Sequence, residues 1–488
     1  MPDGLLDRLG ATGAGVTVDA AERAEASRDW WPLAMTWAAH GEVAAIAGAV
    51  VRPSSPDQVP DVLRLCRDAR VPVTAAGGRS GVEGGSVPLF GGVVLDLCGL
   101  SGVRSVDPHD LVVDVLAGTF GDRLENELRT RHGLTVGHWP QSVSLSTVGG
   151  WLACRGAGQL SNRYGKVEDL VLGLDVVLAD GTTVVTGDHD RQAVGPDLTQ
   201  LFVGSEGTLG VITAARLRVW PAPAANHRSA HGFDTFEAGA EACRQMVRRG
   251  LAPAALRLYD AVEGERSYGT GERAVLLVFD EGDPVVVDAA RRITTDACAQ
   301  AETLDPGLVD RWLDHRNDVS ALQTFVAAGY VVDTLELTTS WRALPAVYPQ
   351  VRDAIAAVPG VIASSAHLSH SYPGGACVYF TFGGRPDDDS VAARDAFHEA
   401  CWDAGTRRAL GLGASLSHHH GVGLNRSRFV AEALGDGGVG VLTALKAALD
   451  PVGILNPGKL GLPSPFGAVP APFSPTPSSF DPAAEVRR

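Results

Sequence analysis

Glycine is distributed unevenly along this chain, and its clustering most limits what the chain can fold into. Many of the 58 glycines lie in three loops, at residues 75–86, 140–165 and 204–213 of the 488-residue sequence. Glycine permits backbone conformations that a side chain forbids, so the N–H groups of such a loop can converge on an anion. Three loops of this kind within one domain indicate a site for a diphosphate and a flat ring rather than ordinary turns.

The first loop lacks the two best-known nucleotide-binding patterns. It reads Ala-Ala-Gly-Gly-Arg-Ser-Gly over residues 75–81 and directly follows the apolar Val-Pro-Val at 71–73. It is neither the Gly-x-Gly-x-x-Gly that opens a helix nor the loop that ends in Gly-Lys-Ser/Thr. A nicotinamide cofactor and a nucleoside triphosphate are therefore not indicated. Taken alone, the loop fits another diphosphate or a plain glycine-rich turn.

Charge and hydropathy exclude several kinds of partner. The chain has 41 basic and 57 acidic side chains, and its formal net charge of −16 repels nucleic acids and anionic lipid surfaces. No apolar run approaches the ~18 residues that span a bilayer, and the N-terminus lacks the features of a signal peptide. The seven cysteines are scattered, which fits reduced thiols. We expect a cytoplasmic protein with a small-molecule substrate, no nucleic-acid partner and no stable membrane insertion, either as a monomer or as a homodimer.

Changes in composition divide the chain into five segments. We expect an N-terminal segment at 1–44, a glycine-rich domain at 45–222, a second domain at 223–410, a C-terminal element at 411–462 and a disordered tail at 463–488. The Pro-Ala-Pro at 221–223 separates the two domains. The tail is rich in proline and serine, a composition that does not form a packed core.

Hydrophobic periodicity predicts an α+β fold. Helices are expected from the capped Ser-Pro-Asp at 55–57 to residue 66, and at 122–132, 236–249 and 441–449. Strands are expected at 93–97, 111–116, 170–185, 255–259, 274–279, 331–337 and 361–382, with a turn at the Asp-Gly of 180–181. The second domain is therefore expected to pack helices on a largely antiparallel sheet.

The three glycine loops resemble the FAD-binding domain of the vanillyl-alcohol oxidase and p-cresol methylhydroxylase superfamily. The most specific matches are Ser-Thr-Val-Gly-Gly at 146–150 and Gly-Ser-Glu-Gly-Thr-Leu-Gly at 204–210. The stretch 450–459 resembles the element that returns from the cap domain to the flavin. The resemblance implies a two-subdomain FAD-binding domain of the p-cresol methylhydroxylase type, followed by an α+β cap domain with an antiparallel sheet.

This resemblance also implies which residues contact FAD. The diphosphate would be held by Ala76, Gly77, Gly78, Arg79 and Ser80. The remaining contacts would come from Pro140, Ser146, Thr147, Gly149, Gly150, Glu206, Gly207, Val211, Ile212 and Asn456. Relatives that attach FAD covalently use a histidine where this chain has Arg79, or a cysteine that residues 142–146 lack. FAD is therefore expected to bind without a covalent link.

Three consecutive histidines, His418, His419 and His420, form the most informative short motif. Imidazole exchanges protons near neutral pH. Successive side chains of an extended segment point to opposite sides, so at most two of the three would then share a site. The Ser-His-His-His-Gly-Val-Gly of 417–423 resembles the histidine loop of alkyldihydroxyacetonephosphate synthases, as does the Ser-Tyr-Pro-Gly-Gly-Ala-Cys of 371–377.

The synthase resemblance implies an active site beside the flavin. It assigns reactive roles to Tyr372, His418, His419 and His420, and it assigns an anionic substrate group to the cap arginines Arg257 and Arg316. Tyrosine has an ordinary pKa of ~10, so Tyr372 would act as a base only beside a cation such as Arg257 or a protonated histidine.

The chain also departs from the synthases. Leu424 stands where they commonly have a lysine, and the end at Arg488 is no peroxisomal signal. In the related D-lactate and glycolate dehydrogenases a glutamate of the corresponding loop can bind metal, but here His419 replaces it. We therefore expect no metal and place His367 and His370 in supporting positions; the alternative, that these two histidines are ligands of a divalent metal, stays open.

The favoured function is that of an FAD-dependent oxidoreductase that acts on an anionic alcohol or hydroxy acid. The first alternative is non-redox exchange of an acyl for an alkyl group through a flavin adduct, as the synthase resemblance implies. The second is oxidation of a D-2-hydroxy acid of the lactate or glycolate type. A non-catalytic flavin-binding module is the third.

Overall fold

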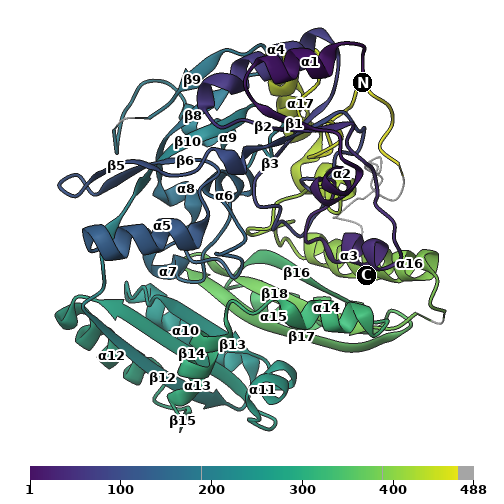
Figure 1. Ribbon diagram of the computed structural model, residues 1–488. Helices are drawn as coiled ribbons and strands as arrows, with labels where there is room; N and C mark the ends of the chain where they lie inside the picture. Colours follow the sequence, from purple (N-terminus) through teal and green to yellow (C-terminus); the bar gives the residue numbers. More distant parts are fainter. Residues whose placement is uncertain (188, 387, 471–488) are drawn as a thin grey trace.

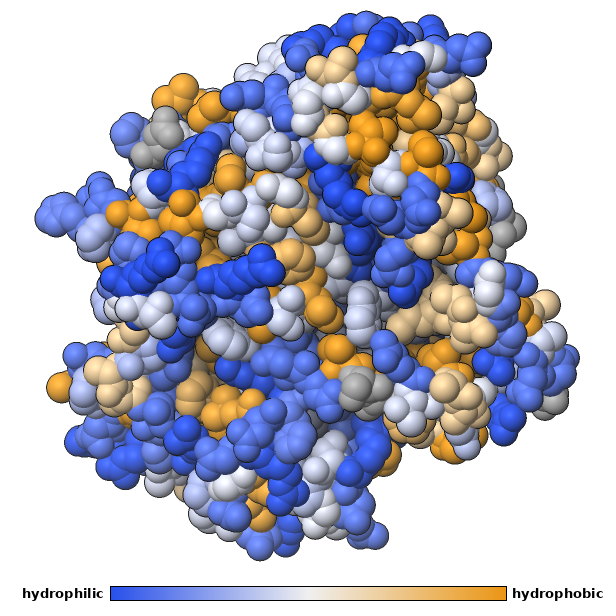
Figure 2. Space-filling view, in the orientation of Figure 1, coloured by the Kyte–Doolittle hydropathy of each residue, from blue (hydrophilic) through white to orange (hydrophobic). Residues whose placement is uncertain are grey.

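Four β-sheets organise the part of the chain that the computed structural model describes, residues 1–187, 189–386 and 388–470 (Figure 1). Two of them belong to an upper lobe in Figure 1, and a seven-stranded sheet forms most of the lower lobe. Helices and strands are mixed throughout, which confirms the predicted α+β class. The face seen in Figure 2 is mostly hydrophilic and interrupted by smaller hydrophobic groups. No helix within the described ranges has the length and apolar character to cross a bilayer.

The first sheet holds the first glycine loop at the end of a parallel strand. Its strand order is β1(Gly15–Thr17)-β2(Ala49–Arg52)-β4(Val93–Asp96)-β3(Val73–Ala76), and β2, β4 and β3 are parallel. β2 and β3 lie on either side of β4, and the crossover that parallel strands need passes through α4(Val59–Asp68), whose buried face consists of Val59, Val62, Leu63 and Cys66. The predicted Ser55 cap is present. The loop starts directly after β3.

The second sheet is antiparallel and supports the other two glycine loops. Its order is β5(Val103–Asp107)-β6(Val112–Leu116)-β10(Val211–Arg218)-β8(Val171–Val177)-β9(Thr183–Val185). The strand expected at 170–185 is thus two strands joined at the predicted turn. The helix expected at 122–132 is α5(Gly121–Glu127), which continues as the π-helical η3(Leu128–His132) and ends at Gly133 with φ +64°. Around this sheet lie α6(Val148–Cys154), α7(Ser161–Tyr164), α8(Val167–Leu170), α9(Leu198–Phe202) and the β7(Leu134–Thr135)–β11(Trp220–Pro221) pair.

The third unit is the cap, whose seven strands are antiparallel as predicted. The order is β15(Glu302–Leu304)-β12(Ala225–Phe233)-β14(Ala274–Gly282)-β13(Ala255–Tyr259)-β17(Val361–Tyr372)-β18(Gly375–Gly384)-β16(Val331–Ser340). One face packs on α10(Phe236–Arg248), α12(Pro284–Ala297), α15(Leu344–Ala356) and α16(Val391–Gly411), and this face is apolar. The helices α11(Ala261–Tyr268), α13(Gly307–His315) and α14(Ser320–Ala327) complete the cap.

The two ends of the chain connect the lobes. At the N-terminus lie α1(Leu5–Ala11), α2(Ala20–Ala26) and α3(Pro32–Ala39), and Trp37 of α3 donates to Asp395 of α16 at 2.9 Å. After the short η4(Ser427–Phe429), α17(Val430–Leu449) contains the helix expected at 441–449 but starts earlier, with a kink at Gly435. The chain then returns to the first sheet, where Leu455 pairs with Val73.

The tail expected to be disordered begins at residue 463. Its first residues, 463–470, are described, and the ring of Phe466 lies 6.3 Å from that of Phe90. The remainder, 471–488, lies outside the described residues.

Candidate active site

One face of the cap sheet holds a row of polar side chains. Alternate residues of a strand point to opposite faces, so the apolar neighbours of these residues enter the cap core. Tyr259 of β13 pairs with His367 of β17, His367 with Tyr379 of β18, and Tyr379 with Glu336 of β16. A register shift between Leu368 and His370 adds a residue to β17. Because of it His370 lies on the same face as His367, although three positions separate them.

The histidine loop lies against this face and is held by Glu336. The Glu336 carboxylate is fully buried and accepts hydrogen bonds from the backbone N–H groups of His418 and His420, the latter at 2.8 Å. It also accepts one from the Ser417 hydroxyl at 2.9 Å. The loop is bent, so the ring centroids of His418 and His419 lie 5.0 Å apart and those of His419 and His420 4.4 Å apart. All three imidazoles therefore share one site, which corrects the expectation for an extended segment.

Two phenol–imidazole pairs result. The Tyr372 hydroxyl lies 2.8 Å from His418 Nε2, and the Tyr379 hydroxyl lies 2.8 Å from His420 Nε2. His418 and His419 are joined through their Nδ1 atoms at 2.8 Å. Tyr372, His418 and His419 thus form a continuous hydrogen-bonded chain. The Nε2 atom of His419 makes no hydrogen bond within the described residues.

His370 and Lys166 both contact His418, the middle member of this hydrogen-bonded chain. The His370 ring stacks on that of His418 at 4.8 Å and 17°, and its Nδ1 lies 2.7 Å from the Ser161 hydroxyl. Lys166 Nζ donates to the backbone oxygen of His418 at 2.6 Å. His370 therefore packs against the His418 ring and helps to fix its position.

Burial keeps the imidazoles neutral and the phenols protonated. Removal from water disfavours a charged imidazole, so the pKa values of His418 and His419 lie well below 6.5 and that of His420 falls to about 4. Burial raises the pKa of Tyr372 far above its usual range. With the histidines neutral and Arg257 donating to Tyr259 at 2.8 Å, neither cation expected beside Tyr372 is placed to stabilise its phenolate. Tyr372 is thus a neutral phenol, whose hydroxyl oxygen can accept a hydrogen bond as well as donate one.

A buried ion group joins the loop to both lobes. Arg426 lies 3.0 Å from Glu336 of the cap and 3.0 Å from Glu83 of the first glycine loop, and none of the three side chains is more than 3% exposed. Burial opposes ionisation of Glu336, but Arg426, His420 and the backbone N–H of His418 bring its pKa down to about 2. Burial raises the pKa of Glu83 well above its usual range. The ionised carboxylate is therefore that of Glu336.

The first glycine loop is shaped for an anion. The backbone N–H groups of Gly77, Gly78, Arg79 and Ser80 find no hydrogen-bond acceptor in the described ranges. A Cβ on Gly77 would lie 2.2 Å from Thr147 Oγ1, an atom that is itself buried without a partner. A Cβ on Gly78 would lie 1.9 Å from the Leu145 oxygen. Unsatisfied donors in a gap that only glycine leaves open fit a diphosphate.

The other predicted cofactor residues surround this gap in part. Ala76 ends β3, and Gly149 and Gly150 lie in α6 beside Thr147. The Ser146 hydroxyl already accepts from the Trp151 indole at 2.7 Å, and Pro140 offers its carbonyl to Asn317 at 3.2 Å. The side chains of Val211 and Ile212 pack into apolar cores, so only their backbone is left for a ligand.

Glu206 of the third glycine loop contacts the histidine loop. Its carboxylate accepts from the backbone N–H of Val422 at 2.6 Å and of Gly423 at 2.8 Å. Only the backbone of Glu206, at φ +50°, is left for a cofactor, together with the adjacent Gly207. Asn456 donates to the Glu206 oxygen at 2.7 Å and to the Gly85 oxygen at 3.1 Å, and its own oxygen is buried without a partner.

The two predicted anion-binding arginines lie beside Trp312 of the cap. The Cζ atoms of Arg257 and Arg316 lie 5.5 and 5.6 Å from the Trp312 ring, and Arg316 also lies 5.0 Å from Trp139. Neither arginine forms an ion pair with a carboxylate among the described residues. Burial lowers the pKa of Arg316 to about 10, and its Nη1 has no partner. Both guanidinium groups are thus available to an anion.

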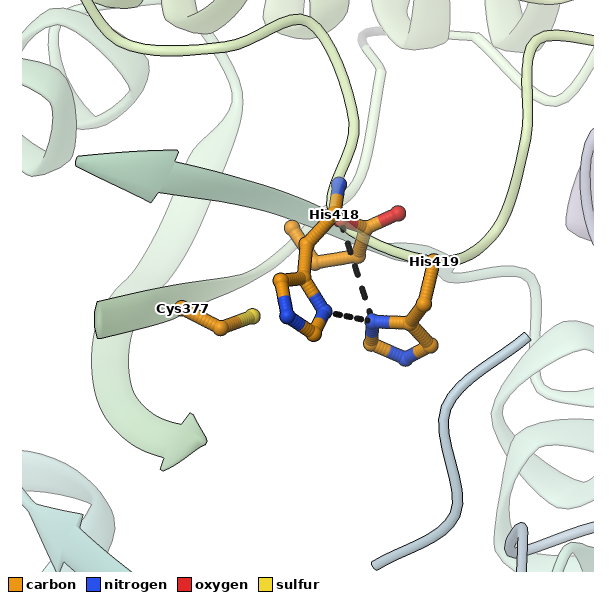
Figure 3. Close-up of side chains that lie close together, drawn as sticks. Cys377, His418 and His419 are labelled. Carbon is orange, nitrogen blue, oxygen red and sulfur yellow. Dashed lines mark hydrogen bonds and ion pairs between the residues drawn. The ribbon is translucent and has the colours of Figure 1, made fainter. Parts of the chain in front are cut away.

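Cys377, His418 and His419 converge on one point, and with Glu336 their donor atoms lie within 4.8 Å of one another (Figure 3). A carboxylate offers about four lone pairs, and Glu336 already accepts from Ser417, His418, His420 and Arg426. Burial raises the pKa of the Cys377 thiol, so it stays protonated. This donor set suits a hydrogen-bonded cluster better than a metal ion.

Sequence reasoning missed Glu336 and Tyr379, which the structure places against the histidines. Both lie inside stretches predicted as strands, at the polar positions of an apolar alternation: Glu336 stands between Leu335 and Leu337, and Tyr379 between Val378 and Phe380. A polar residue at such a position is equally typical of a strand whose second face meets water. The sequence therefore holds no signal that separates these two residues from an ordinary solvent-facing row.

Comparison with known proteins covers most of the chain. The family models "FAD binding domain" and "FAD linked oxidases, C-terminal domain" match residues 47–187 and 222–460. The uncharacterized FAD-linked oxidoreductase YgcU of Escherichia coli O157:H7 is 29% identical over 85% of this chain and 89% of its own. The alkyldihydroxyacetonephosphate synthase of Dictyostelium discoideum is 28% identical over 86% of this chain and 74% of its own.

A solved structure has the same fold. An alkyldihydroxyacetonephosphate synthase superposes with a TM-score of 0.78 at 24% identity, covering 94% of this chain and 86% of that protein. The matches confirm the predicted p-cresol methylhydroxylase-type fold and FAD as the cofactor.

Proposed function

This chain belongs to the FAD-linked oxidases of the p-cresol methylhydroxylase type, and from that membership we propose that it oxidises an anionic alcohol or hydroxy acid. The proposal depends on one observation, the hydrogen-bonded chain that joins the Tyr372 phenol to the neutral imidazoles of His418 and His419. FAD supplies the two-electron redox chemistry when it is bound. The protein has to place the substrate and take up the hydroxyl proton.

His419 is the proposed proton acceptor. When the Nδ1–H of His419 donates to His418 and the Nε2–H of His418 donates to Tyr372, the Nε2 atom of His419 retains a free lone pair. A hydroxyl proton taken by this atom leaves a cation that is in line with His418 and close to Glu336, whose oxygen lies 4.0 Å from His419 Nδ1. The ionised carboxylate stabilises that charge.

Arg257 and Arg316 are proposed to bind the anionic group of the substrate. A guanidinium without a carboxylate partner gains most from an oxyanion, which it can bind through two parallel hydrogen bonds. The open Nη1 atoms of both residues support this role.

The division of labour in this proposal follows the sequence segments. Residues 45–222 bind FAD, 223–410 form the substrate-binding cap, and 411–462 return the histidine loop to the cofactor. The open donors of Gly77, Gly78, Arg79 and Ser80, with Thr147, hold the diphosphate, and no covalent link forms.

A second candidate function keeps the same residues but has no net redox change: exchange of an acyl for an alkyl group. It is favoured by the shared histidine loop and the Tyr372–His418 pair, together with the likeness to alkyldihydroxyacetonephosphate synthase. There His419 would remove a proton from carbon instead of oxygen.

An anaerobic titration separates the two. Purified yellow protein is mixed with a panel of anionic alcohols and hydroxy acids, and the visible flavin band is followed. Bleaching by a panel member supports oxidation, and the variant His419→Gln should retain FAD but bleach roughly 100-fold more slowly, since a positioned proton acceptor contributes at least that much. Failure of every compound to bleach the wild type would instead favour exchange.

A further inference from the structure

The guanidinium of Arg257 is oriented by two neutral acceptors. Its Nε donates to the Tyr259 hydroxyl at 2.8 Å, and its Nη2 lies 2.9 Å from His367 Nε2. Its Nη1 has no partner within the residues that the structure describes. The side chain is therefore held on one edge and open on the other.

His367 itself lies against a carboxylate. Its Nδ1 lies 3.0 Å from Glu263 Oε1, and both side chains are buried. Burial lowers the pKa of His367, so the ring is neutral and has one N–H. With that proton on Nδ1, facing Glu263, the Nε2 lone pair is free to accept from Arg257.

The fold determines the place of Glu263 and His367. Asp260 caps α11 by accepting from the backbone N–H of Glu263 at 2.9 Å, which sets Glu263 in the first turn above β17. The His367 ring stacks on Tyr379 at 5.0 Å and 11°, and Tyr379 contacts His420. The support of Arg257 is thus packed against the histidine loop.

A neutral ring between Glu263 and Arg257 has a chemical consequence. Had the carboxylate paired directly with the guanidinium, it would have neutralised the charge and occupied the fork that binds oxyanions. The interposed His367 orients Arg257 without taking its charge. A purely structural ion pair has no need of such an arrangement.

We propose that Glu263 and His367 are positioning residues that aim the open edge of Arg257 at the oxyanion of the substrate, a carboxylate or a phosphate. This inference rests on the proposed function, in which Arg257 binds that group. It adds the two residues that set the geometry of binding and hence the preference for anionic substrates.

The test is anion binding to the FAD-loaded protein. Oxalate and inorganic phosphate are titrated separately, and the dissociation constant is read from the perturbation of the flavin spectrum. His367→Phe, which removes the acceptor, and Glu263→Gln, which removes the charge that orients the ring, should each raise the constant about threefold to tenfold, the usual worth of one hydrogen bond. His367→Gln retains an acceptor and should stay close to the wild type.

Two further variants complete the design. Glu265→Gln alters an exposed carboxylate of the same helix, α11, and should leave binding unchanged. Arg257→Met should weaken binding more than any other variant. The anion with the larger effect identifies the substrate group as carboxylate or phosphate.

The outcomes separate this inference from the proposed function. If Arg257→Met weakens anion binding but His367→Phe and Glu263→Gln do not, the positioning role is wrong and the anion site stands. The same holds if His367→Gln binds the anion as weakly as His367→Phe does. If Arg257→Met has no effect, or neither anion perturbs the wild-type flavin, the anion site and the positioning role are both wrong. Bleaching by a substrate is independent of either result.

Discussion

Replacing Glu336 by glutamine should disable the histidine loop without releasing FAD. The Glu336 carboxylate accepts from His418, His420, Ser417 and Arg426, and the amide nitrogen of glutamine would meet some of these donors with another donor. Burial and pairing together move the Glu336 pKa from its usual 4.5 to about 2, which corresponds to folding stability on the order of 3 kcal/mol above pH 4.5. This agrees with the ~3–5 kcal/mol lost when one partner of a buried ion pair is removed.

The same displacement of the loop should slow the reaction. If the free energy that holds the loop in its reactive position drops by about 3 kcal/mol, kcat falls by roughly 100-fold, because each 1.4 kcal/mol is a factor of ten. Thermal unfolding of the FAD-loaded protein and turnover of a substrate found in the titration measure the two effects. Glu302→Gln is the matched control, since that strand carboxylate pairs with Arg273 at the surface and should contribute less than ~1 kcal/mol. Wild-type stability and kcat in Glu336→Gln would refute the reasoning.

Three other predictions concern the cofactor and pH. Gly78→Ala should yield colourless protein without FAD, because the added Cβ would lie 1.9 Å from the Leu145 oxygen and distort the loop. The control Gly85→Ala, whose Cβ would have no atom within 4 Å, should stay yellow. Equal flavin content of the two variants would contradict the first-loop assignment. Acid precipitation of the wild type should release all flavin into the supernatant, and flavin that stays with the pellet would show a covalent link. Since burial holds the pKa values of His418 and His419 well below 6.5, kcat should be unchanged from about pH 8 to about pH 6 and fall only at more acidic pH; loss of activity with an apparent pKa near 6.5 would contradict neutral, buried imidazoles.

Local patterns of the sequence predicted most of the secondary structure. Apolar alternation identified the strands of the cap, and the Ser55 cap identified the start of the first crossover helix. These features depend on neighbours a few residues away, which the sequence shows directly. The kink at Gly435 was missed because an isolated glycine in a helical pattern does not reveal whether the helix continues through it.

The arrangement of the site depends on contacts that local patterns do not contain. The row from Tyr259 to Glu336 exists only through the pairing of four strands, and a slip of one residue would turn any of these side chains to the other face. The bulge that brings His370 beside His418 is likewise a property of the pairing. The histidines and Tyr372 were recognisable as a group, but Glu336 and Tyr379 were not.

The histidine loop is secured by acidic side chains that the chain supplies at three widely separated times. Glu83 and Glu206 emerge early in synthesis, Glu336 later, and the loop itself almost last. A fragment that lacks any one of these three regions therefore leaves the loop without part of its support. Any shortened form of the protein has to keep all three together with the loop itself.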